Sequence, residues 1–144
     1  MPHATVELIA RALLIENGRV LVCQNLEKGY LYLPGGHVDA GETAERAVRR
    51  ELIEECGLEI ESCRPALVHE MAADGFQEIN IVFHVERRPA EHGTPVQSNE
   101  SHIGFEWLDL AAVVDADLRP TGIRAWIAAG GIAEGPAVPF VSET

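Results

Sequence analysis

The sequence predicts an α/β domain, because segments with the two-residue alternation of β-strands are interspersed with segments of helical periodicity. The turn signals Asn17-Gly18 and Asp74-Gly75 each lie between two apolar, β-compatible segments and predict two hairpins. A chain of 144 residues with 47% hydrophobic residues can form one core, so we expect a single domain over residues 1–144. The expected strands are residues 6–15, 20–24, 66–71, 76–85 and 106–108.

The segments between and after these strands include helical stretches, a long loop and a tail. Helical structure is expected at residues 43–56, 110–114 and 121–129. Residues 87–104 form a long polar segment that contains Pro89, Gly93 and Pro95, and we interpret them as a substrate-side loop. Residues 131–144 are expected to form an irregular C-terminal tail, because glycine and proline recur in them.

The helix expected over residues 43–56 carries three carboxylates on one face. Glu51 precedes Glu54 by three residues and Glu55 by four, and both spacings bring side chains together on a helix. Two like charges about 4 Å apart repel by roughly 4 kcal/mol at an effective dielectric constant near 20. Arg50 can reach Glu54 one turn away, but it relieves only part of this repulsion. A divalent cation among the carboxylates would relieve the rest.

A glycine-rich segment ahead of this helix fits the same interpretation. Two adjacent glycines in Leu33-Pro34-Gly35-Gly36 let the backbone approach a ligand closely, so that a carbonyl can face a cation. Carboxylate and carbonyl oxygens suit hard ions such as Mg²⁺ and Mn²⁺, which often bind substrate phosphates as well. The segment and the helix together therefore indicate phosphate chemistry.

Between positions 36 and 58 the chain matches one known motif, the Nudix box, G-x5-E-x7-R-E-U-x-E-E-x-G-U, where U is an aliphatic residue. The residues at its specified positions are Gly36, Glu42, Arg50, Glu51, Leu52, Glu54, Glu55, Gly57 and Leu58. The lead-in at residues 32–36 and the downstream residues 106–108 are similar to the corresponding parts of the same family. The chain thus resembles the Nudix hydrolases over roughly residues 5 to 130.

The resemblance implies a Nudix α/β/α sandwich with a central mixed β-sheet. It also implies that Glu54 and Glu55 bind the catalytic metal, that Glu51 binds metal or acts as the base, and that Arg50 orients Glu51. The expected cofactor is Mg²⁺ or Mn²⁺. The carbonyl of Gly35 is implied as a further metal ligand.

Two other acidic positions also follow from the resemblance. Glu42 is expected to steady the loop ahead of the helix. A further base in this family usually comes from the loop before the last sheet strand. Glu100 is the first candidate here, and Glu106 is the second.

The expected activity is metal-dependent hydrolysis of a diphosphate linkage in a nucleoside diphosphate derivative. Residues 76–80 and 118–120 look similar to small ADP-ribose pyrophosphatase-like members, which favours ADP-ribose or a nucleoside diphosphate sugar. The alternatives are a (deoxy)nucleoside triphosphate pyrophosphohydrolase and a Nudix domain that binds a nucleotide without cleaving it. Such binding domains commonly lack one or more of the box glutamates, whereas all of them stand in this chain.

The composition disfavours several classes of binding partner. A formal net charge of −12 disfavours polymeric nucleic acid and anionic membranes, so the expected partner is a small nucleotide. The N-terminal residues lack a signal-peptide pattern, and the odd count of three cysteines lacks metal-type spacing, so we expect a cytoplasmic protein with free thiols. The first hairpin and the apolar residues 138–141 offer surface for a homodimer.

Several other side chains have both a structural and a functional interpretation. Isolated histidines are more often surface or core residues than acid/base groups, and of the four considered we favour His37 and His102 over His69 and His84. Trp107 and Trp126 are interpreted as core residues. Phe76 and Tyr30 are left open between packing and stacking on a nucleobase.

Overall fold

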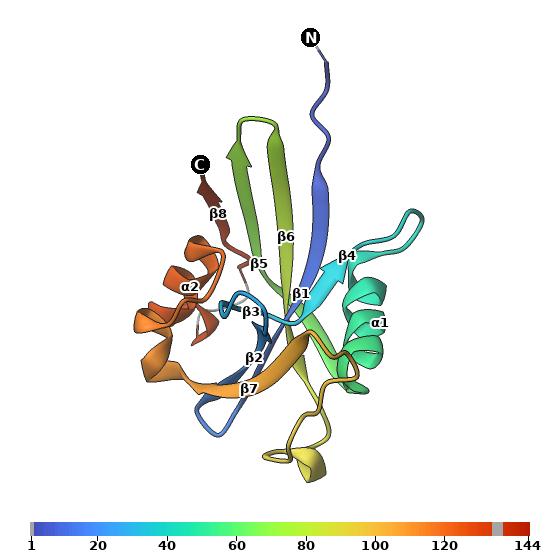
Figure 1. Cartoon of the computed structure of the whole chain (residues 1–144), viewed down its shortest axis with the longest axis vertical. Coiled ribbons are helices and arrows are strands. Elements are labelled where there is room, and N and C mark those ends of the chain that lie inside the picture. The colour runs from blue at the N-terminus through green and yellow to red at the C-terminus, as the bar shows by residue number, and fades with distance from the viewer. Residues whose placement is uncertain (1, 134–136) are drawn as a thin grey trace.

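The computed structural model describes residues 2–133 and 137–144, which form one eight-stranded sheet with helices on both sides (Figure 1). The strands are β1 (Glu7–Glu16), β2 (Arg19–Asn25), β3 (Leu31–Tyr32), β4 (Gly35–His37), β5 (Ser62–Ala73), β6 (Phe76–Glu86), β7 (Ile103–Asp109) and β8 (Phe140–Glu143). The α-helices are α1 (Ala44–Cys56) and α2 (Thr121–Ala128), with short 3₁₀ helices at Pro89–Glu91, Leu110–Asp115 and Gly131–Ala133. None of the helices described is long and apolar enough to cross a membrane.

The sheet is mixed, as expected. Its main order is β3-β2-β1-β6-β5-β8, while β4 pairs with β1 and β7 pairs with β2. The β1/β6 and β5/β8 pairs are parallel, and the other pairs are antiparallel. Strand β1 lies at the centre of the fold, because it pairs with β2, β4 and β6.

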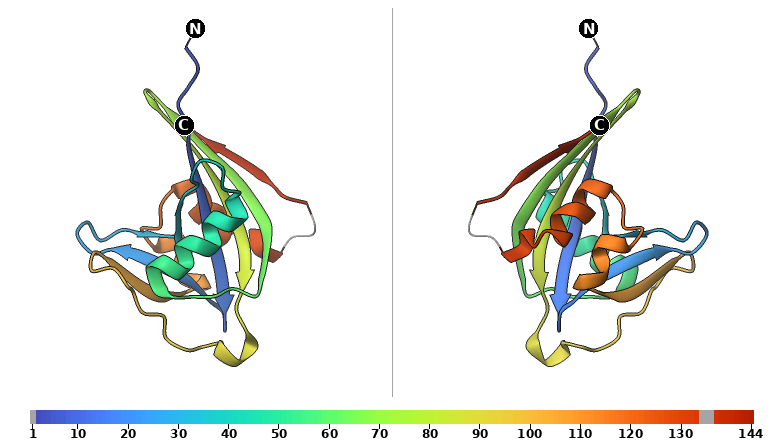
Figure 2. Two further views of the ribbon diagram at one scale, coloured as in Figure 1. Left: turned by 90° about the vertical axis from the view of Figure 1, so that its right-hand side faces the viewer. Right: turned by 90° about the vertical axis from the view of Figure 1, so that its left-hand side faces the viewer.

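The two helices lie on opposite sides of the sheet (Figure 2), which confirms the α/β/α arrangement. One apolar cluster joins α1, through Ala47, Val48 and Leu52, to Phe83 and Val85 of β6. The other cluster packs α2 on the opposite face, and its members include Leu13, Leu67, Val82, Ile123 and Ile127. Helix α1 is thus packed over the sheet through its apolar face.

Local sequence signals produce the expected turns and caps. Asn17 and Gly18 have φ values of 54° and 73°, the left-handed conformation of the tight hairpin turn that the Asn-Gly pair predicts. The side chain of Thr43 accepts a hydrogen bond from the amide of Arg46 at the start of α1. Gly57 ends the helix in the left-handed conformation, with its amide bonded to the last turn.

Two expectations about irregular segments are wrong. The glycine-rich segment ahead of α1 is not among the expected strands, but Gly35–His37 form strand β4, because the glycines let this segment pair closely with β1. The tail expected over residues 131–144 contains a 3₁₀ helix at Gly131–Ala133 and strand β8, and residues 134–136 of it lie outside the described residues. Strand β8 pairs with β5 far away in the sequence, so local turn signals could not reveal it.

Candidate active site

Glycines in strand β4 allow β1 and α1 to approach it from opposite sides. A Cβ atom on Gly35 would lie 2.0 Å from the carbonyl oxygen of Ala10, and the residue has a φ of 141°. A Cβ on Gly36 would lie 2.6 Å from the carboxylate of Glu51 on α1. The absence of both side chains therefore brings the helix carboxylate down onto the strand.

Arg50 ties the acidic side chains of this region together. Its guanidinium donates two hydrogen bonds of 2.8 and 2.9 Å to the carboxylate of Glu42. It also donates to Glu51 at 3.0 Å, to Glu54 at 3.2 Å and to the carbonyl of His37 at 3.1 Å. The two hydrogen bonds from Arg50 to Glu42, with one from the amide of Asp39, lower the pKa of Glu42 to about 2, because they stabilise the charged carboxylate.

Glu55 is the most buried carboxylate of the helix, with a residue exposure of 6%. Burial, together with the charges of Glu51 and Glu100, raises its pKa to about 8, while a hydrogen bond from the amide of Gly35 partly opposes this rise. Its Oε2 atom is buried and has no hydrogen-bond partner among the described residues. A buried oxygen without a donor, next to two other carboxylates, is suited to a cation.

The other predicted acidic residues take different positions. Glu54 has a side chain that is 55% exposed and pairs with Arg50. Glu100 lies in the loop before β7 and is close enough to Glu55 to raise the pKa of that residue. The adjacent Asn99 donates from its backbone to the carbonyl of Glu55 at 2.7 Å, which anchors the loop to the end of α1. Glu106, the reserve candidate, lies on β7 and is exposed.

These residues fit a divalent ion by the chemistry of their donor set. Hard oxygen donors converge where Glu51 meets Gly36 and where Glu55 has its unpaired oxygen. Within residues 2–133 and 137–144, however, no three acidic, histidine or cysteine side chains are already gathered as a metal cage. Arg50 holds Glu54, so Glu54 would have to leave this partner to act as a ligand.

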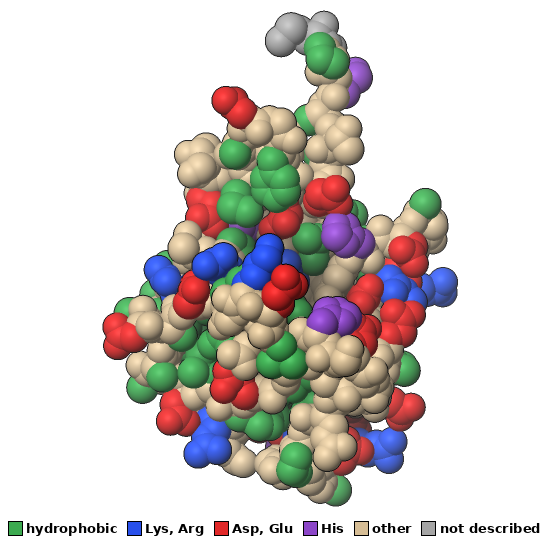
Figure 3. Space-filling view, in the orientation of Figure 1, with side chains coloured by type: hydrophobic (Ala, Val, Ile, Leu, Met, Phe, Trp, Pro, Cys, Tyr) green, Lys and Arg blue, Asp and Glu red, His purple; other side chains and the backbone are tan. Residues whose placement is uncertain are grey.

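A pocket of about 700 Å³ opens beside this group of carboxylates. Its lining residues come from the start of the chain, the β2–β4 region, the β5/β6 hairpin and the segment before α2: Ile9, Arg11, Asn25, Lys28, Tyr30, Tyr32, Gly35, Gly36, His37, Met71, Glu78, Asp117, Arg119, Pro120 and Thr121. Lys and Arg side chains gather near the middle of this face, and acidic side chains with further Lys or Arg lie over α1 (Figure 3). The pocket and the carboxylates meet at Gly35 and Gly36.

Two neighbouring tyrosine rings with an arginine on either side form one wall of the pocket. The guanidinium of Arg119 lies 4.5 Å from the ring centre of Tyr30 and is held by Asp117 through hydrogen bonds of 3.0 and 3.2 Å. The rings of Tyr30 and Tyr32 are 5.9 Å apart, and the guanidinium of Arg11 lies 6.0 Å from the Tyr32 ring. Such a wall offers both aromatic faces and hydrogen-bond donors to a ligand.

The loop expected to bind substrate contributes nothing to the lining of this pocket. Within residues 87–104, Arg87 is buried and makes a two-pronged ion pair with Glu16 at 2.7 and 2.8 Å. Arg87 also lies 5.6 Å from the ring of Trp107, and its guanidinium donates to the carbonyl of Thr94. These contacts give the first half of the loop a structural role, and only its end near Glu100 approaches the carboxylates.

The histidines also separate by environment. His37 lines the pocket and pairs with Glu7 at 2.7 Å, while His102 is exposed and pairs with Glu100 at 3.3 Å. His69 is fully buried, and burial lowers the pKa of His84. Sequence reasoning missed Arg11, Glu78 and Asp117 as pocket residues, because they are isolated polar positions that only the fold brings together.

The fold and the site together define an α/β/α domain in which carboxylates of α1 face the glycines of β4, next to a polar pocket. A family model described as "NUDIX domain" matches residues 7–129, and the chain belongs to this family of pyrophosphohydrolases. The match includes every box residue, from Gly36 to Leu58, and also Glu100.

Two relatives and one solved structure illustrate the similarity. The chain is 31% identical to the oxidized purine nucleoside triphosphate hydrolase of Danio rerio over 74% of its length and 68% of that protein. It is 32% identical to the protein of the same name from Mus musculus over 60% of its length, and it spans only 53% of that relative. A crystal structure of MutT from Bacillus halodurans has a TM-score of 0.74 at 20% identity, covering 94% of this chain and 88% of that one.

The two glycines of β4 are expected to respond differently to substitution by alanine. Gly35→Ala places a Cβ against backbone atoms of β1, which cannot move away, and should lower the free energy of unfolding by about 3 kcal/mol or more. Gly36→Ala meets only the carboxylate of Glu51, which can rotate, and should cost about 1 kcal/mol or less. Urea denaturation measures both values, and equal losses would contradict this account.

The stability of the metal-free protein should depend on the titration of Glu55. The pKa of Glu55 is raised in the folded state from 4.5 to about 8, so its stabilising contribution is present below pH 4.5 and is lost as pH rises to about 8. Glu55→Gln should therefore have an increasing advantage in Tm over this interval, measured in chelator by thermal melting. Glu54→Gln is the matched control, and an advantage of Glu55→Gln that does not change with pH would refute the explanation.

Proposed function

We propose that the protein hydrolyses a nucleoside triphosphate to a nucleoside monophosphate and pyrophosphate. The observation that carries this proposal is the shared border of pocket and carboxylates at Gly35 and Gly36. A nucleotide with its base and sugar in the pocket would extend its phosphates across this border towards Glu51 and Glu55. Within this acidic chain, the pocket supplies three cationic side chains, those of Arg11, Lys28 and Arg119.

The residues of the site have distinct roles in this reaction. Glu51, Glu54, Glu55 and the carbonyl of Gly35 would hold Mg²⁺ or Mn²⁺, which supplies charge neutralisation at the phosphates and a more acidic water. Glu51 or Glu100 accepts the proton of the attacking water. Arg50 keeps the carboxylate of Glu51 in place through its hydrogen bond. No covalent link to the protein is needed, since water attacks phosphorus directly.

A purine base is the favoured group for the pocket. Both relatives described above carry the name oxidized purine nucleoside triphosphate hydrolase, and they match this chain over 60% and 74% of its length. The tyrosine rings at positions 30 and 32 offer faces on which a base can stack. The side chains of Arg11 and Arg119 offer donors to base carbonyls, and those of Glu78 and Asp117 offer acceptors to amino groups.

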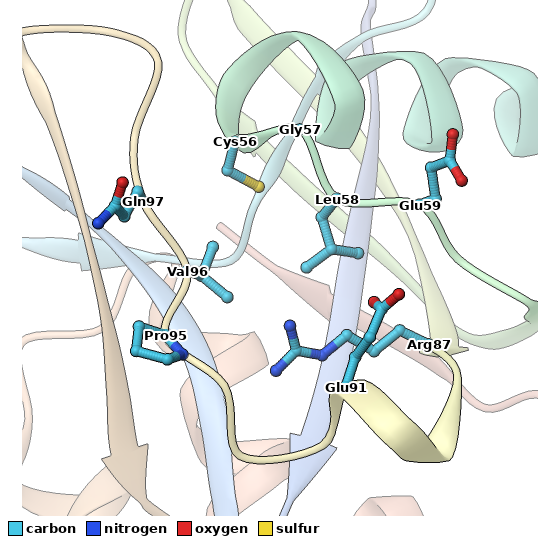
Figure 4. Close-up of a pocket in the computed structure, with 9 residues that line it drawn as sticks. All are labelled: Cys56, Gly57, Leu58, Glu59, Arg87, Glu91, Pro95, Val96 and Gln97. Atoms are coloured by element: carbon cyan, nitrogen blue, oxygen red, sulfur yellow. The ribbon is translucent and has the colours of Figure 1, made fainter.

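ADP-ribose or a nucleoside diphosphate sugar is the second candidate substrate. A smaller hollow of about 350 Å³ lies at the C-terminal end of α1 (Figure 4). Residues 56–59 line one side of it, and Arg87, Glu91 and residues 95–97 line the other. The hollow is therefore bordered by the carboxylates of Glu59 and Glu91 and by the guanidinium of Arg87. A hydroxylated, uncharged group such as a second sugar could occupy it while the first nucleoside fills the larger pocket.

Product identification distinguishes these substrates. A panel of normal and oxidised (deoxy)nucleoside triphosphates, ADP-ribose and nucleoside diphosphate sugars is incubated with Mg²⁺ or Mn²⁺ and separated by anion exchange. Triphosphate hydrolysis should release pyrophosphate and a nucleoside monophosphate, whereas ADP-ribose would yield AMP and ribose 5-phosphate. Preference for ADP-ribose by kcat/KM would overturn the leading proposal.

Substitutions on α1 test whether the acidic cluster performs the reaction. Glu54→Gln and Glu55→Gln should each lower kcat by about 100-fold or more, because both remove a charge that holds the ion. Glu45→Gln, on the exposed first turn of the same helix, is the matched control and should retain activity. Full activity of Glu54→Gln would exclude Glu54 as a ligand. Nucleotide binding by the wild type without any product would instead favour the non-catalytic alternative.

A further inference from the structure

A row of polar side chains crosses the sheet between the apolar core and the pocket. It runs from Glu143 on β8 through His69 on β5 and Asn80 on β6 to Arg11 on β1. His69 and Asn80 are fully buried, and they pair directly across β5 and β6. Buried polar groups of this kind are costly unless each one has its partners.

The donors and acceptors of the hydrogen bonds along the row can be assigned in only one way. Arg11 Nε donates to Asn80 Oδ1 at 2.8 Å, so the amide nitrogen of Asn80 must face the other way. That nitrogen lies 2.8 Å from Glu78 Oε2 and 3.1 Å from His69 Nδ1, and it donates to both. His69 Nδ1 is therefore an acceptor, and its Nε2 carries the proton that it donates to Glu143.

Glu143 holds the far end of the row and joins it to helix α2. Its carboxylate accepts hydrogen bonds from the hydroxyl of Thr121 at 2.8 Å and from the amide of Gly122 at 3.0 Å, besides that from His69. A charged acceptor makes stronger hydrogen bonds than a neutral one. Strand β8, which thereby fixes the ring of His69, is an edge strand of the sheet and is separated from β6 by β5 (Figure 1).

Arg11 forms the near end of the row and lines the pocket. Its Nε is engaged by Asn80, and its Nη1 donates to the carbonyl of Leu33 at 3.1 Å. For Nη2, no hydrogen bond to any of the described residues is found, so the guanidinium is oriented by the protein and keeps a donor for a ligand. Arg11 also pairs with Gly35 across β1 and β4, which places it next to the border with the carboxylates.

We propose that Glu143, through His69 and Asn80, positions Arg11 to donate a hydrogen bond to an oxygen of the bound nucleotide. Arg11 is the residue that contacts substrate, and the other three are positioning residues. This inference rests on the proposed function, because it assigns a recognition role within the same pocket. The C-terminal strand thus controls substrate binding without contacting the substrate.

A double-mutant cycle tests the positioning role. Glu143→Leu removes the acceptor of His69, and Arg11→Met removes the donor while keeping most of the apolar stem. Glu143→Leu should raise KM about tenfold, the size of effect expected for one hydrogen bond to a charged group, and change kcat less than about twofold. In the Arg11→Met background, Glu143→Leu should raise KM no further, because the residue through which it acts is gone.

Two further variants serve as controls for a purely structural effect of the substitution at Glu143. Ser142→Ala removes a hydrogen bond to Glu70 from the neighbouring position of β8 and should leave KM unchanged. Glu143→Gln keeps an acceptor without the charge and should give a smaller rise in KM, and it replaces Glu143→Leu if that variant does not fold by circular dichroism. An equal rise in KM in both Arg11 backgrounds, or no rise in either, would overturn the proposal.

The chemical group that Arg11 contacts is identified by comparing two probes. Inorganic triphosphate and a nucleoside monophosphate are used as competitive inhibitors of the wild type and of Arg11→Met. A base or sugar oxygen as partner predicts that only inhibition by the monophosphate weakens, and a phosphate oxygen predicts that both weaken. If the wild type cleaves no nucleotide, the proposed function fails, and the cycle is then measured from the Kd of the monophosphate by calorimetry.

Discussion

The close pairing of β4 with β1 is the constraint on which the rest of this site depends. Gly35 lies where any side chain would collide with the backbone of β1, and Gly36 lies where it would collide with Glu51. The same pairing sets Gly35 beside Arg11, so the carboxylates of α1 and the donor in the pocket share one border. The close pairing of β1 with β4 therefore places the proposed metal site next to the proposed nucleotide pocket.

The carboxylates around this border are accommodated in two different ways. On α1, Arg50 satisfies Glu42, Glu51 and Glu54, whereas Glu55 is left buried with an unpaired oxygen. The first arrangement stabilises the loop and the helix, whereas in the second the cost of burying a charge raises the pKa of Glu55, and a bound cation would favour its charged form. The site is thus suited to an ion by one carboxylate oxygen that has no hydrogen-bond partner among the described residues.

Much of the fold and part of the site could be predicted from sequence, because their signals are local. The turn at Asn17 and Gly18, the span of α1 with its caps, and the convergence of Glu51 with Glu55 all depend on residues close together in the chain. Strand β8 and the pocket were not predictable in this way. In the sequence, Phe140–Glu143 are predicted to belong to an irregular tail, because the strand β5 that pairs with them lies far away in the chain.

The sequence by itself determined the family and its chemistry, since the Nudix box is a short motif whose spacing alone places carboxylates on one helical face. The tertiary structure decided which carboxylate is buried, that Arg50 holds Glu54, and which side chains line the pocket. Arg11 and Glu143 are 132 positions apart and carry no shared motif, yet they end one continuous row. Burial and long-range pairing arise from strand order, which no local pattern encodes.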